Sequence, residues 1–121
     1  MPILAQILIA IVALEHVLFL VLEMFLWDKP QGMKVFRNTP EAASATKVLA
    51  ANQGLYNGFL ATGLIWSLVP IGAPDAAEAI ATFFLLCVIV AGLYGAASFS
   101  KRILWVQAAP AVIALLFIWA L

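Results

Sequence analysis

The chain has 121 residues, of which 66% are hydrophobic and 10% are charged, and its formal net charge is zero. A soluble domain is about 45–50% apolar and about 25% charged, so this composition predicts an integral membrane protein. The zero net charge excludes the overall basic character of a nucleic-acid-binding protein. The single cysteine, Cys87, cannot form a disulfide within the chain.

The first apolar stretch, residues 3–27, has the length that a membrane-spanning helix requires, about 20 residues. It lacks a preceding basic segment and a following small-residue cleavage site, so we expect it to remain in the mature protein. Three ionisable residues lie within it: Glu15, His16 and Glu23. A charge at the centre of such a helix costs about 2.5–3.5 kcal/mol even on lenient scales. These residues therefore indicate either polar partners in a helix bundle or a function.

The only long connection in the predicted fold is residues 28–47, which we expect to form a cytoplasmic loop. The sequence Asp28-Lys29-Pro30-Gln31-Gly32 is typical of a turn. Thr39-Pro40-Glu41 predicts a helix start, with Thr39 as the capping residue and Pro40 at the first helical position. The second membrane helix is therefore expected to begin before the bilayer.

Three further spans are predicted, at about residues 48–69, 76–99 and 103–121. Each holds roughly the 20 residues that a bilayer core requires. The connection between the last two spans is very short, so we expect these two helices to form an antiparallel hairpin. The sequence therefore predicts an all-α fold: one membrane domain over residues 1–121, built as a four-helix transmembrane bundle.

The basic residues predict the orientation of this bundle. The first loop holds four basic residues, Lys29, Lys34, Arg37 and Lys47, and the third loop holds Lys101 and Arg102. The charged residues of the second loop, Asp75 and Glu78, are both acidic. The positive-inside bias places the first and third loops in the cytoplasm, and both termini then face outward. The expected location is the bacterial plasma (inner) membrane, crossed several times.

Polar residues gather on one side of the predicted second span. At 100° per residue, Asn52, Gln53, Tyr56 and Asn57 fall within an arc of about 140°. Gly54 and Gly58 fall opposite and form a Gly-xxx-Gly pattern suited to close helix packing. This face, or the Gly92/Ala96 face of the third span, is a candidate homo-oligomer interface.

The ionisable and polar residues of the other spans are expected at the same depth in the bilayer as this polar face. Glu15, His16 and Glu23 share an arc of about 120° on the first helix. At about 1.5 Å per residue, the polar side chains of all four spans lie in the cytoplasmic half. We therefore predict an intramembrane pocket that opens to the cytoplasm. Its candidate ligand-binding residues are Glu15, His16, Glu23, Asn52, Gln53, Tyr56, Asn57, Tyr94 and Gln107. Pro110 should break the hydrogen-bond ladder of the fourth span just beyond this region.

Three sequence blocks carry a family resemblance. They are Glu15-His16-Val17-Leu18-Phe19-Leu20-Val21-Leu22-Glu23-Met24, Asn52-Gln53-Gly54-Leu55-Tyr56-Asn57-Gly58-Phe59-Leu60 and Gln107-Ala108-Ala109-Pro110. The second block is specific and the others support it. Together they resemble the bacterial membrane family called domain of unknown function 1304, which is similar in layout to DoxX-like four-helix membrane proteins. The resemblance implies a small four-span protein and supplies no catalytic residues.

Several function classes remain open at this point. The first hypothesis is that the pocket binds or transports a small or lipid-like molecule, with a glutamate as proton carrier. The second is a membrane-embedded enzyme that uses Glu and His as general acid and base on a lipid-like substrate. The third is a structural or assembly subunit, in which the polar groups only hold the bundle together. One histidine provides too few ligands for a transition-metal site, so we expect no metal or cofactor.

Overall fold

The computed structural model describes residues 1–98 and 101–120, with the backbone alone at Ile103. Phe99 and Leu121, at which two of the predicted spans end, lie outside the described residues. The chain packs into two compact units, which are described separately below. Unit 1 comprises Met1–Ala13 and Leu60–Leu121, and unit 2 comprises Leu14–Phe59.

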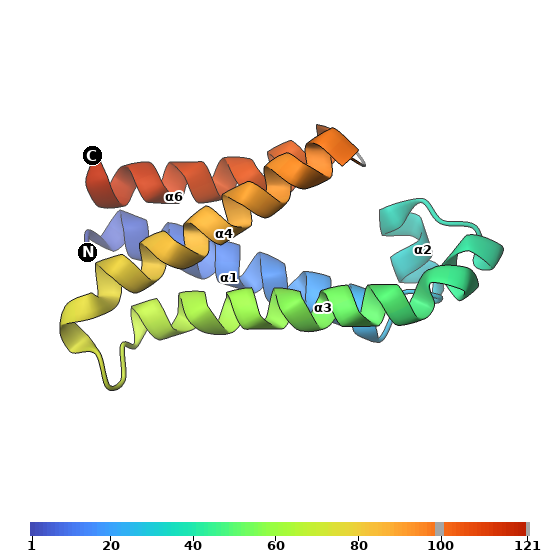
Figure 1. Ribbon diagram of the computed structural model, residues 1–121, viewed down its shortest axis with the longest axis horizontal. Helices are drawn as coiled ribbons and strands as arrows, with labels where there is room; N and C mark the ends of the chain where they lie inside the picture. Colours follow the sequence, from blue (N-terminus) through green and yellow to red (C-terminus); the bar gives the residue numbers. More distant parts are fainter. Residues whose placement is uncertain (99–100, 121) are drawn as a thin grey trace. The chain divides into compact units, whose positions relative to one another are not determined.

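Every regular element in the described residues is helical, as Figure 1 shows. The long helices are α1 (Ile3–Met24), α3 (Pro40–Leu68) and α4 (Ala77–Ser98). The shorter elements are α2 (Pro30–Phe36), a 3₁₀ turn (Pro74–Ala76), α5 (Lys101–Ile103), a π-helical turn (Leu104–Ala108) and α6 (Ala109–Trp119). This part of the chain confirms the all-α prediction.

Two of the described helical segments are long and apolar enough to cross a membrane: Ile3–Met24 and Pro74–Ser98. Leu104–Trp119 is apolar but shorter. Helix α3 is 29 residues long, and the polar residues of its middle, among them Asn52, Gln53 and Asn57, lower its hydropathy. The predicted arrangement of four spans therefore remains a prediction.

The core of unit 1 consists of small and branched apolar side chains contributed by four helices. Its buried members are Ile9, Val12, Ala13, Leu64, Ala81, Leu85, Val88, Ala111 and Ala114. Close approach of the helices depends on small residues: a Cβ at Gly63 would lie 2.3 Å from the Phe84 ring. The buried hydroxyl of Ser67 donates to the Leu64 carbonyl at 2.6 Å, so it is not left without a partner.

Helices α4 and α6 form the predicted antiparallel hairpin (Figure 1). Near one end of the pair, a Cβ at Gly92 would lie 2.7 Å from the Ala108 Cβ. Near the other end, the Trp119 indole donates to Thr82 Oγ1 at 2.7 Å. Residue numbers fall along α4 as they rise along its partner, so the two helices run in opposite directions.

The π-helical turn Leu104–Ala108 lies directly before the segment that contains Pro110. Proline has no N–H and its ring clashes with the carbonyl four residues earlier, here that of Val106. A wider turn at this point accommodates the displaced carbonyls. The predicted break of the helical ladder at Pro110 is confirmed as a π turn.

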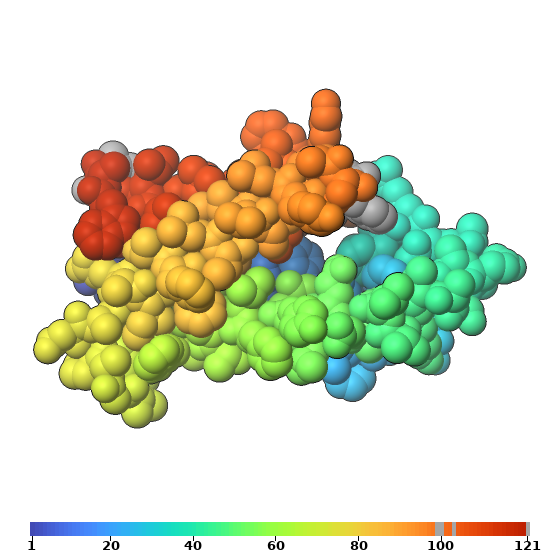
Figure 2. Space-filling model, viewed as in Figure 1, coloured from blue at the N-terminus to red at the C-terminus, as the bar shows by residue number. Residues whose placement is uncertain are grey.

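In the space-filling view, α4, coloured yellow to orange, runs across the visible face of unit 1 (Figure 2). Phe83, Leu86, Val90 and Leu93 are exposed large apolar side chains of this helix. Their spacing of three and four residues places them on one face. An apolar face of this kind suits contact with lipid rather than with water.

Unit 2 contains the end of α1, the whole of α2 and most of α3. The predicted turn at Asp28–Gly32 is only partly a turn, because α2 begins at Pro30. A Cβ at Gly32 would lie 2.0 Å from the Leu26 carbonyl oxygen, so α2 packs directly on the preceding backbone. Arg37 then ends α2 in the left-handed conformation, with φ of 56°.

The start of α3 agrees with the sequence prediction. The helix begins at Pro40, and the Ala42 N–H donates to Thr39 Oγ1 at 3.1 Å. This hydrogen bond satisfies one of the backbone donors that every helix N-terminus leaves free. Thr39 is therefore the capping residue that the sequence predicted.

Candidate functional site

The most unusual side chain of unit 2 is Glu23, in the last turn of α1. It is only 2% exposed, in a helix of membrane-spanning length. Its Oε1 accepts a hydrogen bond from Asn57 Nδ2, and its Oε2 accepts one from Gln53 Nε2. Each carboxylate oxygen thus has one amide donor from α3. We call these three residues the Glu23 clamp.

The spacing of the donors explains how one helix provides both. Gln53 and Asn57 are four residues apart, so they lie one above the other on the same face of α3. Gly54 lies beside them, and a Cβ there would be 2.7 Å from Met24 Cγ and 3.1 Å from Glu23 Cβ. The missing side chain at Gly54 therefore lets the two helices approach closely enough for short amide side chains to reach the carboxylate.

The other two ionisable residues of α1 have different surroundings. His16 is fully buried, and its ring meets that of Phe19 edge-on with centroids 5.4 Å apart. Glu15 is half-buried, and its Oε1 is a buried atom without a hydrogen-bond partner in the part of the chain that the structure describes. An acceptor in that state costs about 1–3 kcal/mol, more if it is charged.

The remaining predicted site residues differ in exposure and in the unit to which they belong. Asn52 and Tyr56 are exposed on α3, with Tyr56 55% exposed. Tyr94 and Gln107 belong to unit 1, where Tyr94 is 74% exposed and Gln107 is half-buried. Of the nine predicted site residues, the structure brings together Glu23, Gln53 and Asn57 by direct hydrogen bonds.

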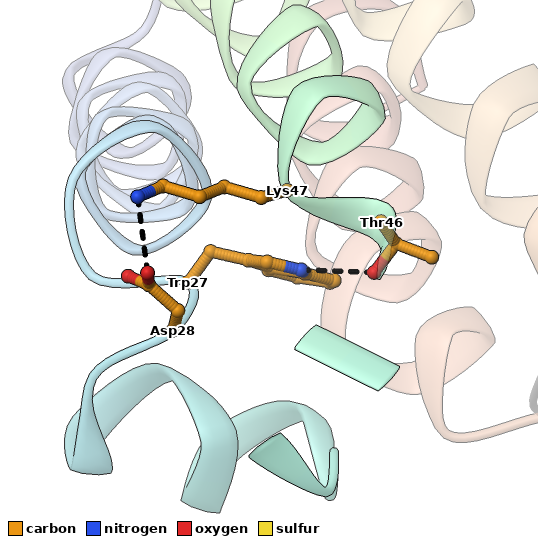
Figure 3. Close-up of polar contacts among 4 residues, drawn as sticks. All are labelled: Trp27, Asp28, Thr46 and Lys47. Carbon is orange, nitrogen blue, oxygen red and sulfur yellow. Dashed lines mark hydrogen bonds and ion pairs between the residues drawn. The ribbon is translucent and has the colours of Figure 1, made fainter. Parts of the chain in front are cut away.

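A second group of polar contacts, not predicted from the sequence, closes the connection between α1 and α3 (Figure 3). The Trp27 indole donates to Thr46 Oγ1 at 3.1 Å, and Lys47 Nζ lies 3.0 Å from Asp28 Oδ2. The hydrogen bond and charge of Lys47 lower the pKa of Asp28 below its usual value. A sequence signal was present, because Asp28 and Lys47 are opposite charges at the two ends of the predicted first loop.

Gly54 and Gly92 are each used for packing inside one chain. Gly54 lies against Glu23 and Met24 of α1, and Gly92 lies against Ala108. Close helix packing was the predicted role of both glycines. A homo-oligomer through the same faces stays a prediction.

Unit 1 carries an open apolar groove of about 330 Å³ between α4, the π turn and α6. A second apolar surface, along Phe83, Cys87, Val90 and Tyr94, is formed by α4 alone. No group of three His, Cys, Asp or Glu side chains suited to a metal ion occurs in the described part of the chain.

These features define a small all-helical protein that has helices of membrane-spanning length and a buried carboxylate held by amide donors. The chain belongs to the family described as "Protein of unknown function (DUF1304)", whose sequence model matches residues 10–119. It is also similar to the "Uncharacterized protein YpaA" of Lactococcus lactis subsp. lactis (strain IL1403). The two are 33% identical over 118 residues, which cover 96% of this chain and 97% of that protein. No solved structure gives a significant match.

Proposed function

We propose that this protein is a four-span protein of the bacterial plasma membrane, with both termini outside. In this proposal it binds or transports a small or lipid-like molecule through polar groups in the cytoplasmic half of the bilayer. The polar groups belong to unit 2, and Glu15, His16 and the Glu23 clamp are their centre. Intramembrane ionisable residues mark ligand or ion sites by default, because a bilayer makes them costly.

The observation that carries ligand binding is the unpaired oxygen of Glu15. Both oxygens of Glu23 already accept hydrogen bonds from α3, whereas the buried Oε1 of Glu15 accepts none from the described residues. A buried acceptor of this kind usually has a hydrogen-bond partner in a folded protein, either from the protein or from a bound molecule. A hydroxyl or N–H group of a ligand would complete it, which makes Glu15 the proposed ligand contact.

The test compares purified wild-type protein with Glu15→Leu, which removes the unpaired acceptor. We expect the wild type to retain a small molecule, visible by native mass spectrometry in mild detergent, and Glu15→Leu to lose it. Without ligand, Glu15→Leu should be the more stable protein by about 1–2 kcal/mol, since an unpaired buried acceptor has been removed. The matched control is Glu78→Leu, which removes an exposed carboxylate of unit 1.

The opposite result has a clear meaning. If neither protein retains a molecule and Glu15→Leu melts at a lower temperature, Glu15 is part of a structural network and the binding proposal is wrong. The Glu23 clamp favours that structural role as the second candidate, because both oxygens of Glu23 accept hydrogen bonds from α3. Buried ion and hydrogen-bond networks of this kind can fix the register of helices.

A further inference from the structure

The 330 Å³ groove of unit 1 has a lining suited to a hydrocarbon chain. Ile89 and Leu93 of α4 form one wall, and Leu104 and Trp105 of the π turn, with Val112 and Ile113 of α6, form the other. We call it the α4–α6 groove.

The length of the α4–α6 groove matches one leaflet of a bilayer. Leu104 and Ile113 are nine residues apart, which corresponds to about 14 Å along a helix. The hydrocarbon core of a bilayer is about 30 Å thick, so one leaflet is about 15 Å. A groove of this length that starts at the membrane surface would end near the midplane, which is the course of a single acyl chain.

Two cations directly precede the Leu104 end of the groove in the chain. Lys101 and Arg102 of α5 are exposed and directly precede the segment with Leu104 and Trp105. Trp105 is 72% exposed, and exposed tryptophans favour the headgroup level of a membrane. Paired basic residues at that level attract anionic lipid headgroups. The apolar groove and the basic pair are therefore complementary to the two ends of one molecule, an anionic phospholipid.

We propose that the α4–α6 groove binds an acyl chain of an anionic phospholipid, with Lys101 and Arg102 holding its phosphate. This proposal rests on the membrane insertion of the proposed function but uses none of its site residues. Glu15 and the Glu23 clamp belong to unit 2, whereas the groove and its cations belong to unit 1. The two proposals can therefore fail separately.

The experiment measures lipid retention by the full chain with native mass spectrometry, using phosphatidylglycerol and phosphatidylcholine of the same chain length. We expect phosphatidylglycerol to bind more tightly than phosphatidylcholine. The variant Lys101→Gln/Arg102→Gln should weaken phosphatidylglycerol binding about 30-fold, since two surface cations at about 1 kcal/mol each contribute about 2 kcal/mol. The matched control is Lys34→Gln/Arg37→Gln, which removes the same charge from unit 2 and should change binding less than about twofold.

A second variant tests the groove itself. Ala109 lines the α4–α6 groove and is half-buried. Ala109→Phe should fill the groove and weaken phosphatidylglycerol binding with no change of charge. Glu15→Leu should leave phosphatidylglycerol binding unchanged, which separates this result from the ligand test above.

Three outcomes would overturn the lipid site. These are equal retention of the two lipids, equal effects of the two charge variants, and an Ala109→Phe protein that folds and binds as the wild type does. Because Lys101 and Arg102 are exposed, their variant keeps the test decisive even if Ala109→Phe does not fold. Release of the chain from membranes by alkaline carbonate would instead contradict the proposed membrane insertion.

Discussion

Glu23 and Glu15 lie eight residues apart on one helix and have opposite hydrogen-bonding states. Glu23 is almost completely buried, and both of its oxygens accept amide hydrogens. Each of these hydrogen bonds is worth about 0.5–1.5 kcal/mol, or about 1.5–3 kcal/mol when the carboxyl group is ionised, so the clamp offsets part of the cost of burying the group. Glu15 has a buried oxygen without such a partner. The first residue holds α1 and α3 together, and the second is the ligand contact of the proposed function.

The clamp leads to a prediction for single side chains. Asn57→Leu leaves Glu23 Oε1 buried without its donor, so we expect a loss of about 1–3 kcal/mol in the free energy of unfolding. Asn52→Leu is the matched control, since Asn52 is exposed on the same helix, and its effect should stay within about 0.5 kcal/mol. Unfolding in detergent mixtures measures both values.

A double-mutant cycle identifies the partner of Asn57. The effects of Glu23→Leu and Asn57→Leu should not add, because each variant removes the same hydrogen bond. Additive effects, or equal effects of Asn57→Leu and Asn52→Leu, would show that the clamp contributes nothing to stability.

At the scale of the helices, glycines determine where backbones approach each other. A Cβ at Gly32 would meet a backbone oxygen of Leu26 at 2.0 Å, which no side-chain movement can relieve. At Gly54 the nearest atoms are Met24 Cγ at 2.7 Å and Glu23 Cβ at 3.1 Å. At Gly58 the nearest atom is Leu20 Cδ1 at 2.7 Å, the end of a flexible side chain.

These contacts predict an order of stability for three alanine variants. Gly32→Ala should cost most, about 2–3 kcal/mol, and Gly54→Ala about 1 kcal/mol, as overpacking does in a dense core. Gly58→Ala should be close to neutral, because Leu20 can move and alanine favours the helix by about 0.5–1 kcal/mol. Thermal unfolding of the three proteins checks the order, and a Gly58→Ala protein less stable than Gly32→Ala would contradict it.

The sequence predicted the long helices but not the short helix α2. The long helices, the Thr39 cap and the α4–α6 hairpin follow from apolar length, capping chemistry and a short connection. Helix α2 was not predicted, because its packing depends on Gly32 meeting a backbone carbonyl, which has no local signature. The helical wheel placed Gly54 opposite the polar arc, yet Gly54 and Asn57 both meet α1. A helical wheel gives the angles of side chains around one helix. It does not show from which direction a neighbouring helix packs against them.

For the whole molecule, both ends of the chain lie in unit 1. Met1 and Ile118 pack against the same core cluster. This supports the proposal that both termini are on one side of the membrane, which requires an even number of crossings. In the same proposal, the basic residues of the first and third predicted loops place these loops in the cytoplasm.

Site-directed labelling tests this topology in a Cys87→Ser background. Lys34→Cys and Asp75→Cys each place a thiol at an exposed position in a different predicted loop. We expect a membrane-impermeant maleimide to label Asp75→Cys in intact cells and Lys34→Cys only after the membrane is opened. The reverse pattern would mean the opposite orientation, and labelling of both in intact cells would contradict a membrane crossing between the two positions.

The Glu23 clamp also bears on how such a chain enters a membrane during synthesis. The partners of Glu23 follow it by only 30 and 34 residues, and all three lie in unit 2. In the proposed membrane arrangement, α1 and α3 would enter the lipid as a helical hairpin in which the Glu23 carboxyl group is already hydrogen-bonded. An acidic side chain opposes insertion of an isolated helix, so this hairpin would lower the cost of inserting α1.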